Sequence, residues 1–205
     1  MKVIGIILAA GQSRRMGMDK LSLPVGKRTM VSTVIDTAAM SNLTSIKIVT
    51  AMNNRSQTFA GHSLIPCRDS IKGQSHSLRC GVEEAERQGA DAIVVLLADQ
   101  PFIQTNTINA LLEMFKNNGE LDFVASRFKG IAQPPVLFSK KAFTVIKQLR
   151  GDKGAGVLIK GPYRLPKGMY IDYKDPKILA DIDTKEVYTR YCLDEGRTTH
   201  AATIY

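Results

Sequence analysis

The chain lacks tryptophan, has only three cysteines and three histidines, and contains no apolar run near the roughly 20 residues that span a bilayer. A disulfide framework or a zinc site would need these residues at closer and more regular spacing. We therefore expect no membrane association, no histidine-based metal cluster and no disulfide framework. The residues concerned, which we expect to be packing or surface residues, are Cys67, Cys80, Cys192, His62, His76 and His200.

The first residues, MKVIGIILAAG, place one lysine before an apolar stretch, as a short signal peptide does. The stretch is brief, however, and it runs into Arg14 and Arg15 where a signal peptide would have a small-residue cleavage site. We interpret the segment as a first buried strand and expect a cytoplasmic protein.

The formal net charge of +9 raises the question of nucleic-acid binding. The lysines and arginines are spread along the chain, and no basic stripe with interleaved aromatic residues is present. A basic protein with an anionic phosphate substrate gains from the same long-range attraction. We therefore favour a small phosphate-bearing substrate and expect no nucleic-acid partner.

Short apolar runs alternate with helical patterns along the whole chain, which suits one domain over residues 1–205. VIGIIL (3–8) and AIVVLL (92–97) are apolar on both faces, as central strands of a parallel sheet are. The alternation predicts an α/β fold with a mostly parallel sheet between two helical layers. The polar residues 197–205 could form a flexible tail. Further strands are expected at 46–51, 122–127, 135–138 and 169–173, and helices at 29–40, 77–88, 105–117, 140–149 and 184–193.

Ligands of open α/β sheets collect at the carboxyl ends of the strands, and the loop LAAGQSRRMGMDK (8–20) follows the first strand. Its small residues 9–11 let the backbone approach a ligand, and Arg14, Arg15 and Lys20 supply cationic donors. Such a loop suits a polyphosphate, although it is neither a Walker A motif nor GxGxxG. The residues alone leave open a solvated basic loop.

This loop resembles the signature of the nucleotidyltransferases that attach a nucleotide to the molybdenum cofactor, which reads approximately LAAGxSxRMGxxK. The resemblance to this MobA/MocA-like family implies a Rossmann-like nucleotide-diphospho-sugar transferase fold. It also implies catalytic roles for Arg15, Lys20 and Asp99. The nucleotide-binding residues that it implies in the loop are Leu8, Ala9, Ala10, Gly11, Ser13, Arg15 and Lys20.

Further segments resemble the family's motifs in the family's order, over almost the whole chain. GQSHSL (73–78) resembles a segment near the base, which implies base-region contacts from Gly73, Ser75 and Ser77. ADQP (98–101) resembles the segment whose aspartate holds Mg²⁺. GDKGA (151–155) and DIDT (181–184) also match, and the second of these implies a further metal ligand.

The implied magnesium site uses Asp99 and Asp183, with Asp181 in reserve, because Mg²⁺ prefers one or two carboxylates together with phosphate and water oxygens. Two alternatives remain open at this point. Asp99 could be a turn residue before Pro101, and Asp183 could cap the helix that begins near residue 184.

The resemblance implies transfer of CMP from CTP to the phosphate of a molybdopterin-type cofactor, with release of pyrophosphate. Ala10 favours CTP, because the GTP-using branch usually has LAGG at this point. The subgroup implies a molybdenum hydroxylase client such as xanthine dehydrogenase, in purine catabolism. Residues 132–135 (AQPP) and Gly156 depart from the family pattern, so the acceptor is less well defined. The alternatives are a sugar or polyol phosphate acceptor, or a non-enzymatic cofactor chaperone.

Overall fold

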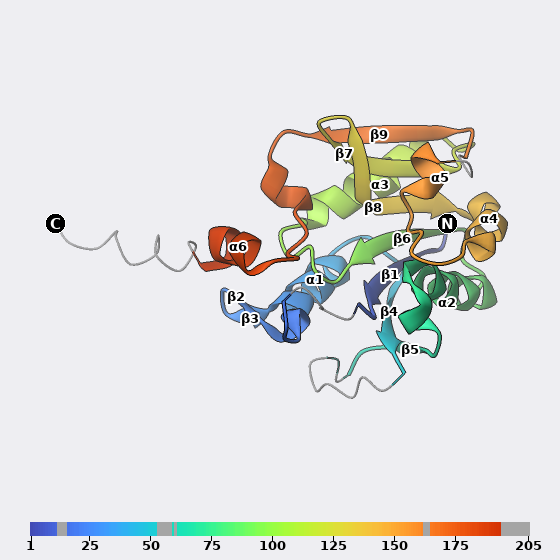
Figure 1. The fold of residues 1–205 in the computed structure, drawn as a ribbon. Coiled ribbons are helices and arrows are strands. Elements are labelled where there is room, and N and C mark those ends of the chain that lie inside the picture. Colours follow the sequence, from blue (N-terminus) through green and yellow to red (C-terminus); the bar gives the residue numbers. More distant parts are fainter. Residues whose placement is uncertain (12–15, 53–58, 60, 162–164, 194–205) are drawn as a thin grey trace.

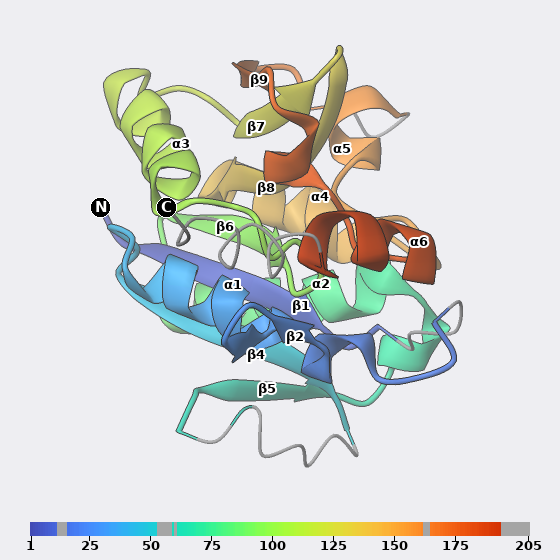
Figure 2. The same cartoon turned by 90° about the vertical axis from the view of Figure 1, so that its left-hand side faces the viewer.

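The computed structural model describes residues 1–11, 16–52, 59, 61–161 and 165–193. A seven-stranded sheet in the order β5-β4-β1-β6-β8-β7-β9 forms the centre of the molecule (Figures 1 and 2). Its strands are β1 (Val3–Ala9), β4 (Ser45–Ala51), β5 (Leu64–Cys67), β6 (Ala92–Leu97), β7 (Phe123–Phe128), β8 (Ile131–Ser139) and β9 (Gly168–Tyr173).

The predicted mostly parallel α/β sheet is confirmed. β1 pairs in parallel with β4 and β6, β4 with β5, and β7 with β9, whereas β8 runs antiparallel to both of its neighbours. The carboxyl ends of β1, β4 and β6 therefore meet at one edge of the sheet, where this class of fold binds its ligands.

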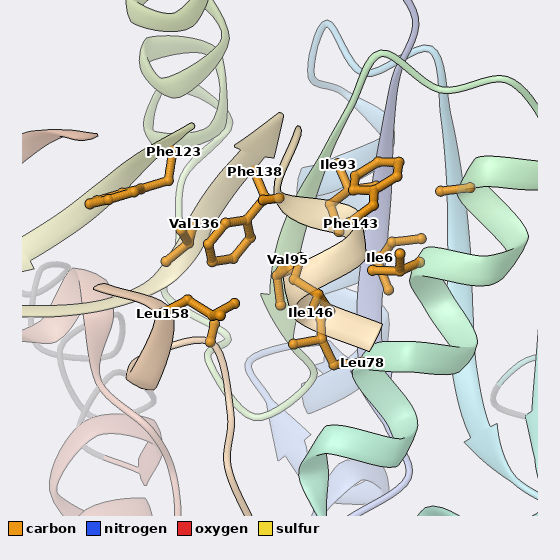
Figure 3. Close-up of a cluster of buried hydrophobic side chains, with 14 of the residues drawn as sticks. Ile6, Leu78, Ile93, Val95, Phe123, Val136, Phe138, Phe143, Ile146 and Leu158 are labelled. Atoms are coloured by element: carbon orange, nitrogen blue, oxygen red, sulfur yellow. The ribbon is translucent and has the colours of Figure 1, made fainter. Parts of the chain in front are cut away.

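Both faces of the sheet are covered, which gives three layers. Along β1 the side chains alternate between two apolar clusters: Ile4 and Ile6 face one, and Val3 and Ile7 face the other. The first cluster packs against α2, α4 and α5 (Figure 3), and the second against α1 and α3. The helices are α1 (Met30–Ala39), α2 (Gln74–Arg87), α3 (Thr105–Asn117), α4 (Phe143–Gln148), α5 (Val157–Lys160) and α6 (Lys185–Tyr188).

Helix α2 lies unusually close to β1, because Gly81 faces the strand without a side chain. A Cβ atom at Gly81 would overlap the Cγ2 atom of Ile6. The start of α2, which follows Gly73, is thereby held near the carboxyl end of β1.

Short elements were missed by the sequence patterns. These are β5, the α5 turn, and the hairpin of β2 (Pro24–Val25) and β3 (Arg28–Thr29). The helix expected at 184–193 is instead α6 followed by a π turn over Thr189–Leu193. Within the described ranges, no helix has the length and apolarity needed to cross a membrane.

The expectation that no cysteines pair was wrong for Cys67 and Cys80, whose Sγ atoms form a disulfide with the Cα atoms 6.1 Å apart. Cys67 ends β5, a strand that the sequence pattern did not reveal, and α2 runs back beside this strand. The spacing along the chain therefore hid their proximity. Cys192 is buried and takes no part in this disulfide.

Candidate active site

A cavity of about 660 Å³ opens at the carboxyl ends of β1 and β6. Residues from five separate parts of the chain meet there: β1 and the loop after it, residues 70–77 at the start of α2, the end of β6 and the loop after it, Asp152 between α4 and α5, and the segment that precedes α6. The lining residues are Leu8, Ala10, Gly11, Lys20, Ser70, Ile71, Gly73, Gln74, Ser77, Leu97, Asp99, Asp152, Asp181 and Asp183.

Lys20 bridges two aspartates in this cavity. Its Nζ atom lies 2.6 Å from Oδ2 of Asp99 and 2.6 Å from Oδ1 of Asp183. The lysine side chain is only 10% exposed. Burial by itself would lower the pKa of Lys20, but attraction by Asp99 and Asp183 outweighs it and raises the pKa above the ordinary value. The ammonium group is therefore charged, and its single positive charge partly offsets the two carboxylates.

Lys20 is positioned by a short helical turn. It begins a 3₁₀ helix (Lys20–Ser22), and the carboxylate of Asp19 caps this turn by accepting from the Leu21 amide at 3.2 Å. The turn leads into the β2–β3 hairpin. Just before the hairpin, the Leu23 carbonyl accepts a hydrogen bond from the Met30 amide, which follows it, at 2.8 Å. Lys20 thus lies on a segment between the glycine loop and α1 that these hydrogen bonds hold in place.

The loop after β6 is tied directly to the segment that carries the other aspartates. The Ile182 amide donates to the Asp99 carbonyl at 2.9 Å, and the Gln100 side-chain amide donates to the Leu179 carbonyl at 3.2 Å. Ile182 is fully buried, whereas its neighbours Asp181 and Asp183 line the cavity. Two regions far apart in sequence therefore present their carboxylates at one place.

Ile182 also belongs to a small apolar cluster, which we call the C-terminal cluster, formed by buried Val25, Met30, Ile182 and Cys192 with Phe102, Val187, Tyr188 and Tyr191 around them. The Tyr188 hydroxyl donates to the Pro24 carbonyl at 2.7 Å. Figure 1 shows α6 beside the β2–β3 hairpin. The hairpin that follows Lys20 and the helix that follows Asp183 are thus packed together.

Asp181 differs electrostatically from its neighbours. Burial, followed by the negative charges of Asp99 and Asp183, raises the pKa of Asp181 to about 7. It therefore carries less negative charge near neutral pH than an ordinary carboxylate does.

Asp183 does not cap helix α6, because the neighbouring residue takes that role. Thr184 is the N-cap of α6, and its hydroxyl oxygen accepts from the Val187 amide at 3.3 Å. Asp183 instead pairs with Lys20 in the cavity, as Asp99 does. Both aspartates therefore line the same cavity, and their role as magnesium ligands stays a prediction.

The carboxylates of Asp99 and Asp183 are suitable ligands for a divalent cation. Asp99 and Asp183 each place an oxygen 2.6 Å from one point, which the Lys20 ammonium occupies. Within the part of the chain that the structure describes, no group of three or more His, Cys, Asp or Glu residues is arranged to hold a metal ion. Two carboxylates completed by phosphate and water oxygens are a usual Mg²⁺ environment, so the residues fit that ion.

Only some of the predicted nucleotide-binding residues line this cavity. Leu8, Ala10, Gly11, Lys20, Gly73 and Ser77 line the cavity. Ala9 is buried in the core, and Ser75 is 1% exposed with its hydroxyl donating to the Gly151 carbonyl. Ser13 and Arg15 lie outside the described residues.

Sequence reasoning gave no role to Ser70, Ile71, Gln74 and Asp152, which also line the cavity. Gln74 and Asp152 stand inside the GQSHSL and GDKGA segments, which was the available signal. Ser70 and Ile71 belong to a 3₁₀ turn, Ser70–Lys72, that no motif marked.

Residues 5–167 match the model of the family described as the MobA-like NTP transferase domain. The chain belongs to this family of nucleotidyltransferases. It is 40% identical over 197 residues, 91% of this chain and 94% of the relative, to the purine catabolism protein PucB of Bacillus subtilis strain 168. It is 30% identical over 113 residues, 54% of this chain and 58% of the relative, to a molybdenum cofactor guanylyltransferase of Rhodobacter capsulatus.

Among solved structures, the chain is similar to Rv0371c of Mycobacterium tuberculosis H37Rv in complex with manganese. The TM-score is 0.72 at 22% identity, over 94% of this chain and 99% of the other. This likeness agrees with the predicted Rossmann-like nucleotidyltransferase fold.

Proposed function

We propose that this member of the MobA-like family transfers CMP from CTP to the phosphate of a molybdopterin-type molybdenum cofactor and releases pyrophosphate. The observation that carries the proposal is the Lys20 ammonium, 2.6 Å from both Asp99 and Asp183, in a cavity lined by the glycine-containing loop. The product would support maturation of a molybdenum hydroxylase such as xanthine dehydrogenase.

The cavity suits a nucleoside triphosphate. Its volume of about 660 Å³ lies within the usual range of small-molecule sites. Ala10 and Gly11 present backbone with little side chain in the way, so phosphate oxygens can approach their amides. Asp99 and Asp183 would hold Mg²⁺, which when bound neutralises phosphate charge.

In the reaction that we propose, an oxygen of the acceptor phosphate attacks the α-phosphorus of CTP in line. A new P–O bond forms between the acceptor oxygen and the α-phosphorus as the bond from the α-phosphorus to the bridging oxygen breaks. The electron pair of the broken bond leaves with that oxygen, which becomes part of pyrophosphate. Lys20, together with Arg15 of the same loop, would stabilise the charge that develops on the phosphate oxygens. Such transfer depends on positioning and electrostatics and needs no covalent enzyme intermediate.

Three observations support the finer assignments. Ala10 stands in the LAAG form of the loop, which favours CTP. The similarity to PucB, which is named for purine catabolism, favours a xanthine dehydrogenase client. The manganese in the Rv0371c complex favours a divalent metal at the two aspartates.

The proposal is tested by mixing the purified chain and Mg²⁺ with CTP, GTP, ATP or UTP and a molybdopterin-type cofactor, and by measuring pyrophosphate. We expect CTP to give the highest kcat/KM, and an Asp99→Asn variant to serve as the inactive control. Preference for GTP would contradict the nucleotide assignment.

Two further acceptor tests separate the alternatives. Turnover of CTP with a sugar or polyol phosphate, but not with molybdopterin, would show another acceptor for the same chemistry. Tight binding of the cofactor without pyrophosphate release under any condition would show a chaperone.

A further inference from the structure

Two of the motif segments, GQSHSL and GDKGA, touch each other at the cavity. A Cβ atom at Gly73 would overlap the carbonyl group of Gly151, and one at Gly154 would overlap the side-chain amide of Gln74. Gly73 therefore permits a backbone approach that any larger residue would block, whereas at Gly154 the neighbouring atoms are the end of the flexible Gln74 side chain. The start of α2 and the 151–155 loop are built to lie against each other.

Ser75 forms the polar part of this contact. Its hydroxyl donates to the Gly151 carbonyl at 2.7 Å, and its own amide donates to the same oxygen at 3.2 Å. The side chain is 1% exposed and does not line the cavity. Ser77, two residues later, does line it. The two serines of the motif therefore face different partners.

The Gly151 carbonyl precedes a residue that faces the cavity. Gly151 has a φ of +68°, which reverses the chain, and Asp152 then lines the cavity. The Gln74 amide donates to Oδ1 of Asp152 at 3.3 Å. Three consecutive residues at the start of α2 thus fix the backbone and the carboxylate of one short turn.

We propose that Ser75 is a positioning residue that presents Asp152 to the cavity by holding the Gly151 carbonyl, in place of the base contact that the sequence suggested. The kinetic part of this inference rests on the proposed function. The structural part does not, because the hydrogen bonds of Ser75 exist whatever the substrate is.

The test compares Ser75→Ala, Asp152→Ala and the double variant. Ser139→Ala is the matched control, because Ser139 is also buried, at 5% exposed against 1% for Ser75, and its hydroxyl has no hydrogen-bond partner among the described residues. Ser139 also pairs with Ala92 at the opposite end of β6 from the cavity. We expect hydrogen–deuterium exchange of amides 152–156 to rise about tenfold in Ser75→Ala, from the loss of one hydrogen bond, and to stay unchanged in Ser139→Ala.

The kinetic readout follows a double-mutant cycle. Ser75→Ala should lower kcat/KM about tenfold, with the same division between kcat and KM as Asp152→Ala. The double variant should be no worse than Asp152→Ala, since Ser75 acts through that residue. Two results would overturn the proposal in favour of a direct nucleotide contact. One is a kcat/KM of the double variant that equals the product of the two single effects, and the other is a rise in the Kd for CTP in Ser75→Ala but not in Asp152→Ala.

A second variant covers the case in which Ser75→Ala does not fold. Gly73→Ala keeps the hydroxyl but displaces the Gly151 carbonyl, so it should raise exchange over 152–156 as well. Unchanged exchange in both variants would overturn the proposal. Absence of pyrophosphate release by the wild-type chain would defeat the proposed function instead, and the exchange result would still decide the role of Ser75.

Discussion

The Ile182 amide donates to the Asp99 carbonyl across 2.9 Å, and this bond joins the two halves of the candidate metal site. Asp99 follows β6 in the centre of the sheet, whereas Asp183 lies on a segment outside any strand. Together with the hydrogen bond from Gln100 to the Leu179 carbonyl, this bond fixes the position of the second carboxylate relative to the first.

Lys20→Ala should lower kcat by about 10²–10³, the usual cost of losing one transition-state donor. The same variant should bind Mg²⁺ at lower concentrations in the absence of nucleotide, because the ammonium no longer occupies the point between Asp99 and Asp183. Pyrophosphate release and the Mg²⁺ dependence of Tm measure the two effects. Lys27→Ala, at an exposed position in the β2–β3 hairpin, is the control. Wild-type kcat in Lys20→Ala would remove the lysine from the mechanism.

Asp183→Asn keeps the size of the side chain but removes its charge. We expect the Mg²⁺ concentration for half-maximal turnover to rise about 10- to 100-fold, as it does when the surroundings of a metal lose a supporting group. A Mg²⁺ titration of initial rates measures the change. The control is Asp172→Asn, which breaks an ion pair with Arg127, since neither residue lines the cavity. If both variants have the same Mg²⁺ dependence, Asp183 is not a ligand.

Gln100→Ala should destabilise the protein by about 2 kcal/mol, because it removes a hydrogen bond and leaves a void at a fully buried position. Gln100 joins the Asp99 loop to Leu179, so the Mg²⁺ affinity should weaken as well. Urea denaturation gives the free energy of unfolding. Gln104→Ala, at an exposed position, should change it by less than about 0.5 kcal/mol. Equal free energies of unfolding for the two variants would show that the buried Gln100 amide does not stabilise the fold.

Gly81→Ala tests the close approach of α2 to β1. The added methyl group would overlap Ile6, and overpacking of this kind costs about 1–3 kcal/mol, more than the gain in helix propensity. Gly119→Ala is the control, since nothing lies within 4 Å of a Cβ atom there. Urea denaturation measures both variants. A more stable Gly81→Ala protein would mean that the helix can move away from the sheet at little cost.

Much of the fold could be predicted from periodicity, because the strands at 92–97 and 3–8 are apolar on both faces and their helices are long. Asp99 was identified because the ADQP segment that contains it, just after such a strand, resembles the family's motif. The hairpin at 24–29, β5 and α5 were missed because each is too short to show a period. The disulfide between Cys67 and Cys80 was missed for the same reason, since it depends on β5.

The site itself was less predictable than the positions of its aspartates. The bridge made by Lys20 depends on hydrogen bonds of Ile182 and Gln100 that no local pattern encodes. The two serines of GQSHSL look equivalent in sequence. They differ only because Gly73 and Gly151 bring another loop against Ser75 and leave Ser77 facing the cavity.

The C-terminal cluster has a consequence for the order in which the protein becomes competent during translation. Lys20 and Asp99 emerge from the ribosome well before Ile182 and Asp183, and the cluster that seats Ile182 needs Cys192 and its neighbours. A nascent chain that ends before these residues can assemble the central strands but not the paired carboxylates. The growing polypeptide should therefore remain unable to capture the metal until this last anchor has been synthesised.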